Sequence, residues 1–438
     1  MFNFWGTHKI GILGDANSGK TVFLTSLLWN LEDRKLKLGR KLQAPTGIQI
    51  HNPKNEHDFD YDGHKRDCQE QKLWPAKTVE DYSLATCSYE LDSFFKRKLT
   101  FVDIPGERMA DLLIWQCNDY ADWSVEMLRS WKSSPIISAY MQEYEKLLSK
   151  EKASLEELSW EYKKGMRKLL LNYIPQISPS TLFFNNGKEA KMEDINSDIW
   201  LKNRSIWYHG DEAHDFFPLL IDWKEKDKEL YVSCEKNYKL YRNKIIKPLF
   251  SQIGSCDNFI ICIDILGILS LSPGAYLKTK EELKCFIKKI APGFWKKLLN
   301  GIGRNPPRIA FVATKSDLVY GEDLQHLRDL LEELVDPFVT KEIQFGYFTC
   351  TAWNSTKKAE DSNHAIYTIK VKGDDGQDQY RLAVMNCSPL PDEWPDNWNG
   401  EEFADFNQPM LPNIVKTKAP KQTGIDAILN FVTGDGNE

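Results

Sequence analysis

The residues with the clearest chemical meaning form a glycine-containing loop near the start of the chain. An apolar run at His8–Leu13 precedes this loop, and apolar residues at helical spacing follow it through Lys20–Leu31. The loop matches the pattern G-x-x-x-x-G-K-[ST] at Gly14, Asp15, Ala16, Asn17, Ser18, Gly19, Lys20 and Thr21, with Val22 next in the helix. In this pattern the backbone N–H groups and the lysine hold phosphate oxygens, while the last hydroxyl ligates Mg²⁺. The segment therefore predicts a strand, a phosphate-binding loop and a helix whose positive end faces the phosphates. A purely structural glycine turn is the alternative.

A second segment places a carboxylate at the end of an expected strand. The residues Leu99–Gly106 read LTFVDIPG, so that Asp103 directly follows four strand residues. A carboxylate in this position helps to hold Mg²⁺ in phosphate-loop proteins. Gly106 has no side chain, and its N–H can therefore approach a terminal phosphate closely. An ordinary turn is the alternative for this motif taken alone.

A third segment has the residue types that read a purine base. The strand-like run Ile309–Ala313 leads into Thr314-Lys315-Ser316-Asp317, a T-K-x-D variant of the N-K-x-D motif. A buried aspartate accepts hydrogen bonds from guanine N1–H and the N2 amine, and adenine lacks both donors. The alkyl stem of Lys315 is expected to stack over the base. After the next strand, Thr351 and Ala352 are expected to back the base. The alternative for T-K-x-D is a solvent-exposed charged turn, and the threonine in first place leaves ATP open.

Hydrolysis requires further groups near the terminal phosphate. Lys20 supplies positive charge, and Thr78 is placed in the sequence to close over Mg²⁺ and that phosphate. Glu107 directly follows D-x-P-G, where a water-orienting residue stands in small GTPases. Its charge would repel the phosphate unless Arg108 or Lys77 compensates, so slow intrinsic hydrolysis is expected. The alternatives are an ordinary loop threonine and a surface acid paired with Arg108.

The sequence predicts a metal site and suggests a second ion. The expected Mg²⁺ ligands are Thr21, Thr78 and Asp103. Asn17 stands where some cation-activated GTPases use asparagine, so K⁺ is a further candidate cofactor. An asparagine that merely suits the backbone angles of the loop is the alternative.

The elements that must position these residues follow from hydrophobic patterning. Short apolar runs predict strands at Ser83–Leu91, Leu99–Val102, Phe259–Ile263, Ile309–Ala313 and Phe345–Thr349. The first two are joined by a short charged turn, which favours a hairpin. Helical stretches separate the others, so we expect an α/β fold, a Ras-like P-loop G domain with a mostly parallel sheet.

The remaining parts differ in pattern. Residues 107–247 read as a mainly helical insertion, with one or two helices in Ile136–Leu171 and another in Tyr231–Phe250 that ends near Pro248. A second hairpin is expected from Ile366–Lys372 and Tyr380–Asn386. The expected organisation is a G domain in two parts, 1–106 and 248–360, the insertion 107–247, a hairpin with a Pro/Trp-rich loop at 361–424 and a final helix at 425–438.

Composition excludes several classes of protein. The 438 residues carry a net charge of −6, which argues against a nucleic-acid binder that works by bulk charge. No apolar run approaches the roughly 18 residues of a membrane span, although peripheral membrane contact stays compatible with the sequence. The nine cysteines are scattered and no secretory signal is evident, which favours a reducing, cytoplasmic location.

With these residues in place, the chain resembles the YcjX-like family of bacterial P-loop NTPases. The resemblance rests on SGKT, FVDIPGE, YADWS, KPLF, FIICIDIL, ATKSD and IDAILNFVTGD, and it extends along most of the chain. It implies a Ras-like G domain with a helical insertion, turnover of GTP or ATP, and a stress-linked role. The chain departs from the family in 176–230, so no partner surface is carried over there.

These observations favour a regulatory GTPase that binds Mg²⁺ and GTP or GDP. Its helical insertion would report the nucleotide state to a protein effector of unknown identity. One alternative is an ATPase with the same phosphate machinery. The other is a nucleotide-binding scaffold that does not hydrolyse.

Overall fold

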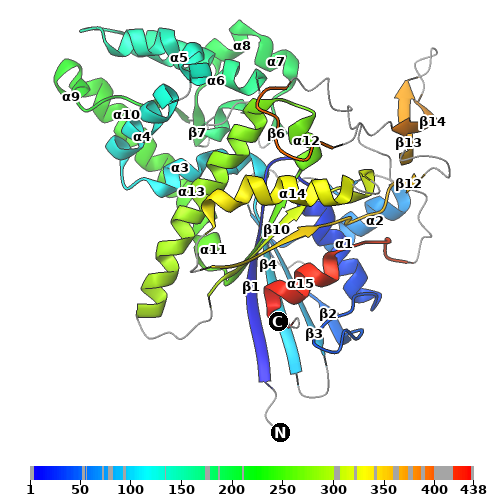
Figure 1. Cartoon of the computed structure of the whole chain (residues 1–438). Coiled ribbons are helices and arrows are strands. Elements are labelled where there is room, and N and C mark those ends of the chain that lie inside the picture. The colour runs from blue at the N-terminus through cyan, green and yellow to red at the C-terminus, as the bar shows by residue number, and fades with distance from the viewer. Residues whose placement is uncertain are drawn as a thin grey trace. The chain divides into compact units, whose positions relative to one another are not determined.

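The computed structural model shows a mixed α/β protein built on a mostly parallel seven-stranded sheet (Figure 1). The structure describes residues 4–51, 55, 57–71, 74–76, 82–91, 95–133, 135–172, 178–185, 188–209, 212–299, 306–319, 323–339, 343–358, 365–372, 378–385, 390–398 and 418–435. The chain divides into two compact units. The first contains residues 1–106, 253–273 and 290–438, and the second contains 107–252 and 274–289.

The central sheet of the first unit has the strand order β11-β10-β9-β1-β4-β3-β2. Its strands are β1 (Phe4–Leu13), β2 (Thr46–Ile50), β3 (Ser83–Glu90), β4 (Phe95–Asp103), β9 (Asn258–Ile263), β10 (Arg308–Ala313) and β11 (Gln344–Thr349). The strands from β11 to β4 are parallel, whereas β3 pairs antiparallel with β4 and β2 pairs antiparallel with β3. The predicted β3–β4 hairpin is therefore confirmed, whereas the edge strand β2 was missed.

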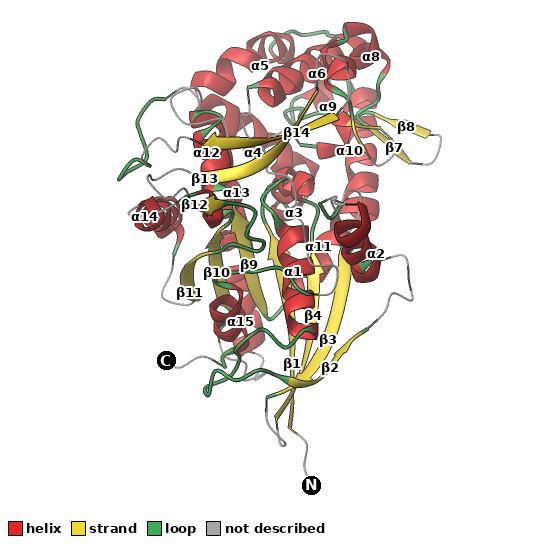
Figure 2. Cartoon of the chain, turned by 90° about the vertical axis from the view of Figure 1, so that its right-hand side faces the viewer, coloured by secondary structure: helices red, strands yellow, loops and turns green. Residues whose placement is uncertain are grey.

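Burial follows the position of each strand. Every residue of β9 is buried, as expected for a parallel strand covered on both faces, and this explains its continuous apolar run. The antiparallel strand β3 alternates between buried and partly exposed residues. The core on one face unites apolar residues of these strands with α1 (Lys20–Glu32) and α15 (Ile425–Thr433), two helices that Figure 2 shows beside the strands. The helix α14 (Asp323–Val335) packs against β10 and β11.

Other elements of the first unit are shorter. They are α2 (Tyr61–Arg66), a π-helical turn (Asp67–Gln71), α12 (Ile265–Leu269), the 3₁₀ turns Ser316–Leu318 and Asp336–Phe338, and a small sheet of β12 (Lys357–Lys358), β13 (Ala365–Lys372) and β14 (Asp378–Met385). The antiparallel pairing of β13 with β14 confirms the second predicted hairpin. The Trp-rich segment 390–398 is a packed loop, because the indole N–H groups of Trp394 and Trp398 donate to Leu330 O and Leu269 O.

The second unit is mainly helical. Its helices are α3 (Leu112–Gln116), α4 (Tyr120–Ser133), α5 (Pro135–Leu148), α6 (Leu155–Leu171), α7 (Met192–Asn196), α8 (Asp198–Asn203), α9 (Trp223–Lys226), α10 (Lys228–Tyr241), and the parts of α11 (Lys247–Gly254) and α13 (Pro273–Leu299) that lie within 107–252 and 274–289. It also contains the 3₁₀ turn Ser180–Phe183 and the strand pairs β5 (Phe184–Asn185) with β6 (Lys188–Glu189) and β7 (Trp207–His209) with β8 (Glu212–His214).

Two helix predictions in this region can be compared with the structure. Two helices, α5 and α6, occupy the region Ile136–Leu171, and Ser154 begins α6 with a capping box. The prediction of a helix end near Pro248 was wrong, because α10 continues through a π-helical turn (Arg242–Ile246) into α11. The π-helical turn just before Pro248 interrupts the regular hydrogen-bond ladder of the helix, so the missing N–H of proline is tolerated there. The compact unit also extends past Lys247 to Gln252. Among the described helices, none is long and apolar enough to cross a bilayer.

Candidate functional site

The glycine-containing loop connects the carboxyl end of β1 to the first turn of α1. Three residues of this loop have a positive φ angle: Gly14 (139°), Asn17 (65°) and Gly19 (85°). Residues other than glycine and asparagine rarely adopt such backbone angles. A Cβ atom on Gly14 would lie 2.1 Å from the carbonyl oxygen of Cys262 in β9. Only glycine fits there. The loop conformation thus explains the glycines and also gives a conformational reason for Asn17, without testing the K⁺ prediction.

Lys20 folds back onto this loop. Its side chain is buried, and its Nζ atom donates to the carbonyl oxygens of Gly14 and Asp15 at 2.8 and 2.7 Å. The Ser18 hydroxyl also donates to Asp15 O, at 2.8 Å. A buried ammonium that donates to neutral carbonyl oxygens gains further from an anionic partner. The predicted phosphate ligand would supply that partner.

Strand register brings Asp103 to the same place. Because β1 and β4 are parallel, Asp103 pairs with Ile12, two residues before Gly14. Asp103 is fully buried, and its Oδ2 atom lies 3.5 Å from Oγ1 of Thr21, the first-turn threonine of α1. A hydroxyl and a carboxylate oxygen are ligands that Mg²⁺ prefers, so these two side chains fit the predicted metal site. When bound, Mg²⁺ would neutralise phosphate charge there.

Gly106 lies directly against the glycine-containing loop after β1. A Cβ atom added to Gly106 would lie 2.2 Å from Ala16 N and 2.3 Å from the carbonyl carbon of Asp15. A side chain of any size would therefore collide with the loop backbone. The sequence predicted that this glycine allows a close approach, and the structure shows the approach to the loop itself.

The T-K-x-D motif lies at the carboxyl end of β10, with Asp317 buried. Its Oδ2 atom accepts hydrogen bonds from the N–H and the hydroxyl of Ser355 at 2.8 and 2.7 Å. Burial raises the pKa of the Asp317 carboxyl above its ordinary value, although the Ser355 hydrogen bonds and the Lys315 charge act in the opposite direction. The carboxylate is thus held in one orientation, as a base-reading group requires.

Parallel strand pairing brings the predicted base-reading and phosphate-binding motifs together. Ile263, Ala313 and Thr349 pair across β9, β10 and β11, so the residues after them meet at one edge of the sheet. A Cβ atom on Gly19 would lie 4.0 Å from Thr314 Cβ. The loop after β1 and the motif after β10 are therefore neighbours. The connections after β1 and β9 run in opposite directions, because β1 leads toward β2 and β9 leads toward β10. Ligands bind at such a point in open α/β sheets.

The expected base-backing residues are also at this edge. Thr351 is buried, and its hydroxyl pairs with that of Ser316 at 2.8 Å. The Ala352 carbonyl oxygen accepts a hydrogen bond from the Ser26 hydroxyl of α1. The same helix that begins with Lys20 and Thr21 thus holds the loop after β11.

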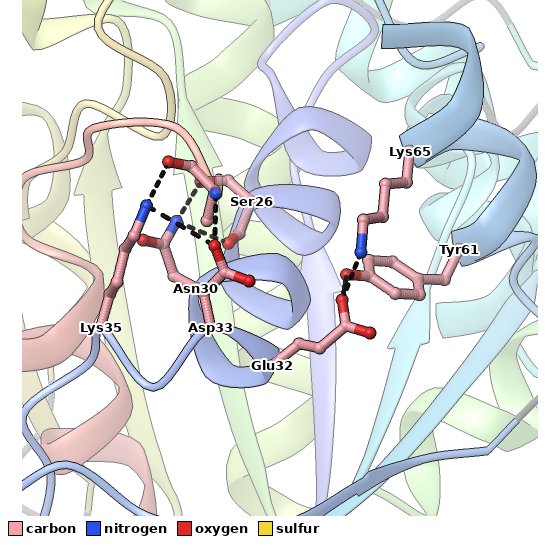
Figure 3. A network of polar contacts seen from close by, with 8 residues as sticks. Ser26, Asn30, Glu32, Asp33, Lys35, Tyr61 and Lys65 are labelled. Atoms are coloured by element: carbon pink, nitrogen blue, oxygen red, sulfur yellow. Dashed lines mark hydrogen bonds and ion pairs between the residues drawn. The ribbon is translucent and has the colours of Figure 1, made fainter. Parts of the chain in front are cut away.

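Further polar contacts fix the other end of α1 (Figure 3). Glu32 accepts hydrogen bonds from the Tyr61 hydroxyl at 2.7 Å and from Lys65 Nζ at 2.5 Å, both on α2. Asp33 accepts from Ala419 N at 2.6 Å, and Lys35 Nζ donates to Ala419 O at 2.5 Å. These contacts restrain the helix that carries the first-turn site residues.

Four predicted groups are not placed in this constellation by the described residues. Thr78 and Lys77 lie outside the described residues. Glu107 is partly buried and is the first residue of the second unit. Arg108 is buried, and its Nη1 atom donates to the Ser180 hydroxyl at 3.0 Å. The catalytic assignments of Thr78 and Glu107 stay predictions.

Two residues of the site were missed by sequence reasoning. Asp264 follows β9 and forms an ion pair with Lys315. Its signal was readable, because a carboxylate after a fully apolar strand is the pattern that identified Asp103. Ser355 holds Asp317 from a position beyond the recognised Thr351-Ala352 pair, and no local pattern indicated it.

Comparison with known proteins gives a family assignment. No curated protein sequence matches the chain. The family model described as YcjX-like family, DUF463, matches residues 8–182 and 208–436. This match covers both the loop after β1 and the motif after β10, together with most of the second unit. The chain therefore belongs to the YcjX-like family.

Proposed function

We propose that this protein is a Mg²⁺-dependent P-loop nucleoside triphosphatase with a Ras-like G domain, which binds and slowly hydrolyses GTP. The observation that carries the proposal is the buried ammonium of Lys20, which lies over the loop carbonyls beside the Thr21–Asp103 pair. In the proposal, Lys20 exchanges its carbonyl partners for phosphate oxygens. Thr21 and Asp103 would hold Mg²⁺.

Base preference in this proposal rests on Asp317. A buried carboxylate oriented by Ser355 can accept both guanine donors, and it would face no donors on adenine. The Thr314 side chain occupies the position of the more usual asparagine, and its hydroxyl donates to Ile263 O at 3.3 Å. This contact gives the threonine a role in fixing the turn.

The switch part of the proposal uses the contact of Gly106 with the loop. A terminal phosphate would compete for the same space next to Ala16, so that Gly106 and the segment after it would move between nucleotide states. We propose that the helical unit that begins at Glu107 reports this movement to a protein effector. The hydrolytic water would be oriented by Glu107, whose charge keeps the intrinsic rate low.

Nucleotide binding and phosphate release test this function. Wild-type protein should bind GDP with Mg²⁺ more tightly than ADP in isothermal titration calorimetry, and it should release phosphate from GTP. Lys20→Ala removes a charged hydrogen-bond donor, which should weaken GDP binding by about 10- to 150-fold. Lys37→Ala, at an exposed lysine of the same unit, is the matched control and should bind as wild type does. Equal GDP affinity of the Lys20 and Lys37 variants would contradict the proposal.

A further inference from the structure

An ion pair joins the ends of two neighbouring strands at the candidate site. Asp264 directly follows β9, and its Oδ2 atom contacts Nζ of Lys315, which follows β10. The second oxygen of Asp264, Oδ1, accepts a hydrogen bond from Gly267 N at 2.9 Å and thereby caps α12. One carboxylate thus binds both the lysine and the start of a helix.

The location of the pair gives it a functional meaning. In the sheet, β9 lies between β10, which carries the base-reading motif, and β1, which leads into the loop at Gly14. Lys315 has a φ angle of 60°, and its side chain reaches from the end of β10 to the end of β9. A nucleoside that connects Asp317 with the loop after β1 must pass over this region. The lysine stem is therefore stretched across the path of the base and the sugar.

The pair contributes little to stability, because it is partly open to solvent. The side chains of Lys315 and Asp264 are 39% and 16% exposed, and exposed pairs of this kind are screened by water. Its effect on ligand binding is different. A lysine loses much rotamer freedom when it is immobilised, and a lysine fixed in advance loses less of it when a ligand binds.

We propose that Asp264 is a positioning residue for purine-nucleotide binding, which acts by holding Lys315 extended below the nucleoside. This inference rests on the proposed function, since it requires a nucleotide at the site. It adds a determinant outside the T-K-x-D motif. It also links the base site to α12, because the carboxylate that holds the lysine is the cap of that helix.

A substitution can separate the two roles of the carboxylate. Asn and Asp are equally good helix caps, so Asp264→Asn keeps the bond to Gly267 N and removes the charge that holds Lys315. Asp227→Asn is the matched control, because Asp227 caps α10 through Leu230 N at 3.0 Å in the second unit. Both variants should unfold at the wild-type temperature without ligand.

Two ligands report on different parts of the site. Inorganic pyrophosphate with Mg²⁺ probes only the phosphate loop, whereas GDP with Mg²⁺ also probes the nucleoside region. Asp264→Asn should weaken GDP binding by about 3- to 10-fold, the effect of one long side chain that is no longer fixed. Its pyrophosphate affinity should stay within about twofold of wild type. Asp227→Asn should leave both affinities unchanged.

A double-mutant cycle identifies the route of the effect. If Asp264 acts through Lys315, then Lys315→Met and the double variant Lys315→Met/Asp264→Asn should bind GDP equally. Unchanged GDP binding in Asp264→Asn, a parallel loss of GDP and pyrophosphate binding, or additive losses in the double variant would overturn the inference and leave the proposed function intact. A wild-type protein that binds neither GDP nor ADP would overturn both.

Discussion

Adding one methyl group at Gly106 should disturb the loop that follows β1. In Gly106→Ala the new Cβ would lie 2.2 Å from Ala16 N, 2.3 Å from the Asp15 carbonyl carbon and 2.6 Å from the Asp15 oxygen. Ordinary contacts between such atoms are about 3.5 Å, so backbone must move by about 1 Å. The φ angle of Gly106 lies outside the left-handed region, so alanine meets no backbone restriction and the cost is steric.

The expected magnitude follows from the stiffness of packed backbone. Overpacking of this kind costs about 1–3 kcal/mol. If the folded state keeps the strain, the nucleotide-free protein should unfold about 2 °C lower for each kcal/mol. If the loop moves instead, the cost should appear as about 5- to 150-fold weaker GDP binding. Denaturation of the nucleotide-free protein and calorimetric titration with GDP therefore have to be measured together.

A second glycine provides the control for this experiment. Gly254 is the last residue of α11, and a Cβ atom added there would have nothing within 4 Å. Gly254→Ala should leave GDP affinity unchanged and should be neutral or slightly stabilising, by about 0.5–1 kcal/mol at most. If Gly106→Ala matched Gly254→Ala in both unfolding and GDP binding, the argument that Gly106 needs its small size against the loop would be refuted.

The remaining predictions concern two buried carboxylates. Burial raises the pKa of the Asp317 carboxyl above 3.8, the ordinary value of an aspartate. Because guanine binds only the ionised carboxylate in the proposal, GDP affinity should fall as the pH is lowered, with a midpoint above 3.8. Ser355→Ala removes a hydrogen bond to the charged form and should move this midpoint to higher pH in titrations of GDP binding; an unshifted midpoint would argue against the role of Ser355. In the second unit, Asp111 accepts from Ser180 N at 3.0 Å and from the Tyr241 hydroxyl at 2.7 Å. Asp111→Ala leaves these buried donors without the acceptor and should lower the free energy of unfolding by about 3 kcal/mol or more. Chemical denaturation monitored by tyrosine and tryptophan fluorescence measures this loss. Wild-type stability of the variant would contradict the role given to the Asp111 hydrogen bonds.

Local patterns predicted the elements that depend on neighbouring residues. The apolar runs of β9 and β10 were readable, because strands buried on both faces have few polar positions. The edge strand β11 was readable from its apolar run Phe345–Thr349, although its residues are exposed or partly exposed. The C-terminal helix was readable from its helical periodicity and from Gly434, which has the left-handed conformation of a helix end. Pro248 misled the prediction because the effect of a proline depends on the hydrogen-bond ladder before it, and a π-helical turn interrupts that ladder at Arg242–Ile246.

Edge strands and boundaries were harder to predict from the sequence. β2 is exposed along most of its length and contains few apolar residues, so it has no hydrophobic signature. The second unit includes residues 274–289, which are separated in the sequence from its main segment. Membership in a compact unit depends on contacts between distant segments, and no window of sequence contains that information.

By itself the sequence determined the glycine turn between Gly14 and Thr21 and the placing of Asp103 and Asp317 at or just after the ends of strands. Residue type and spacing within a short segment were sufficient for this, and the chemistry that they indicate there stays a prediction. The tertiary structure alone decided that Asp264 pairs with Lys315 and that Gly106 lies against Ala16. These contacts arise from strand order and register, which bring together the ends of strands that are far apart in the chain.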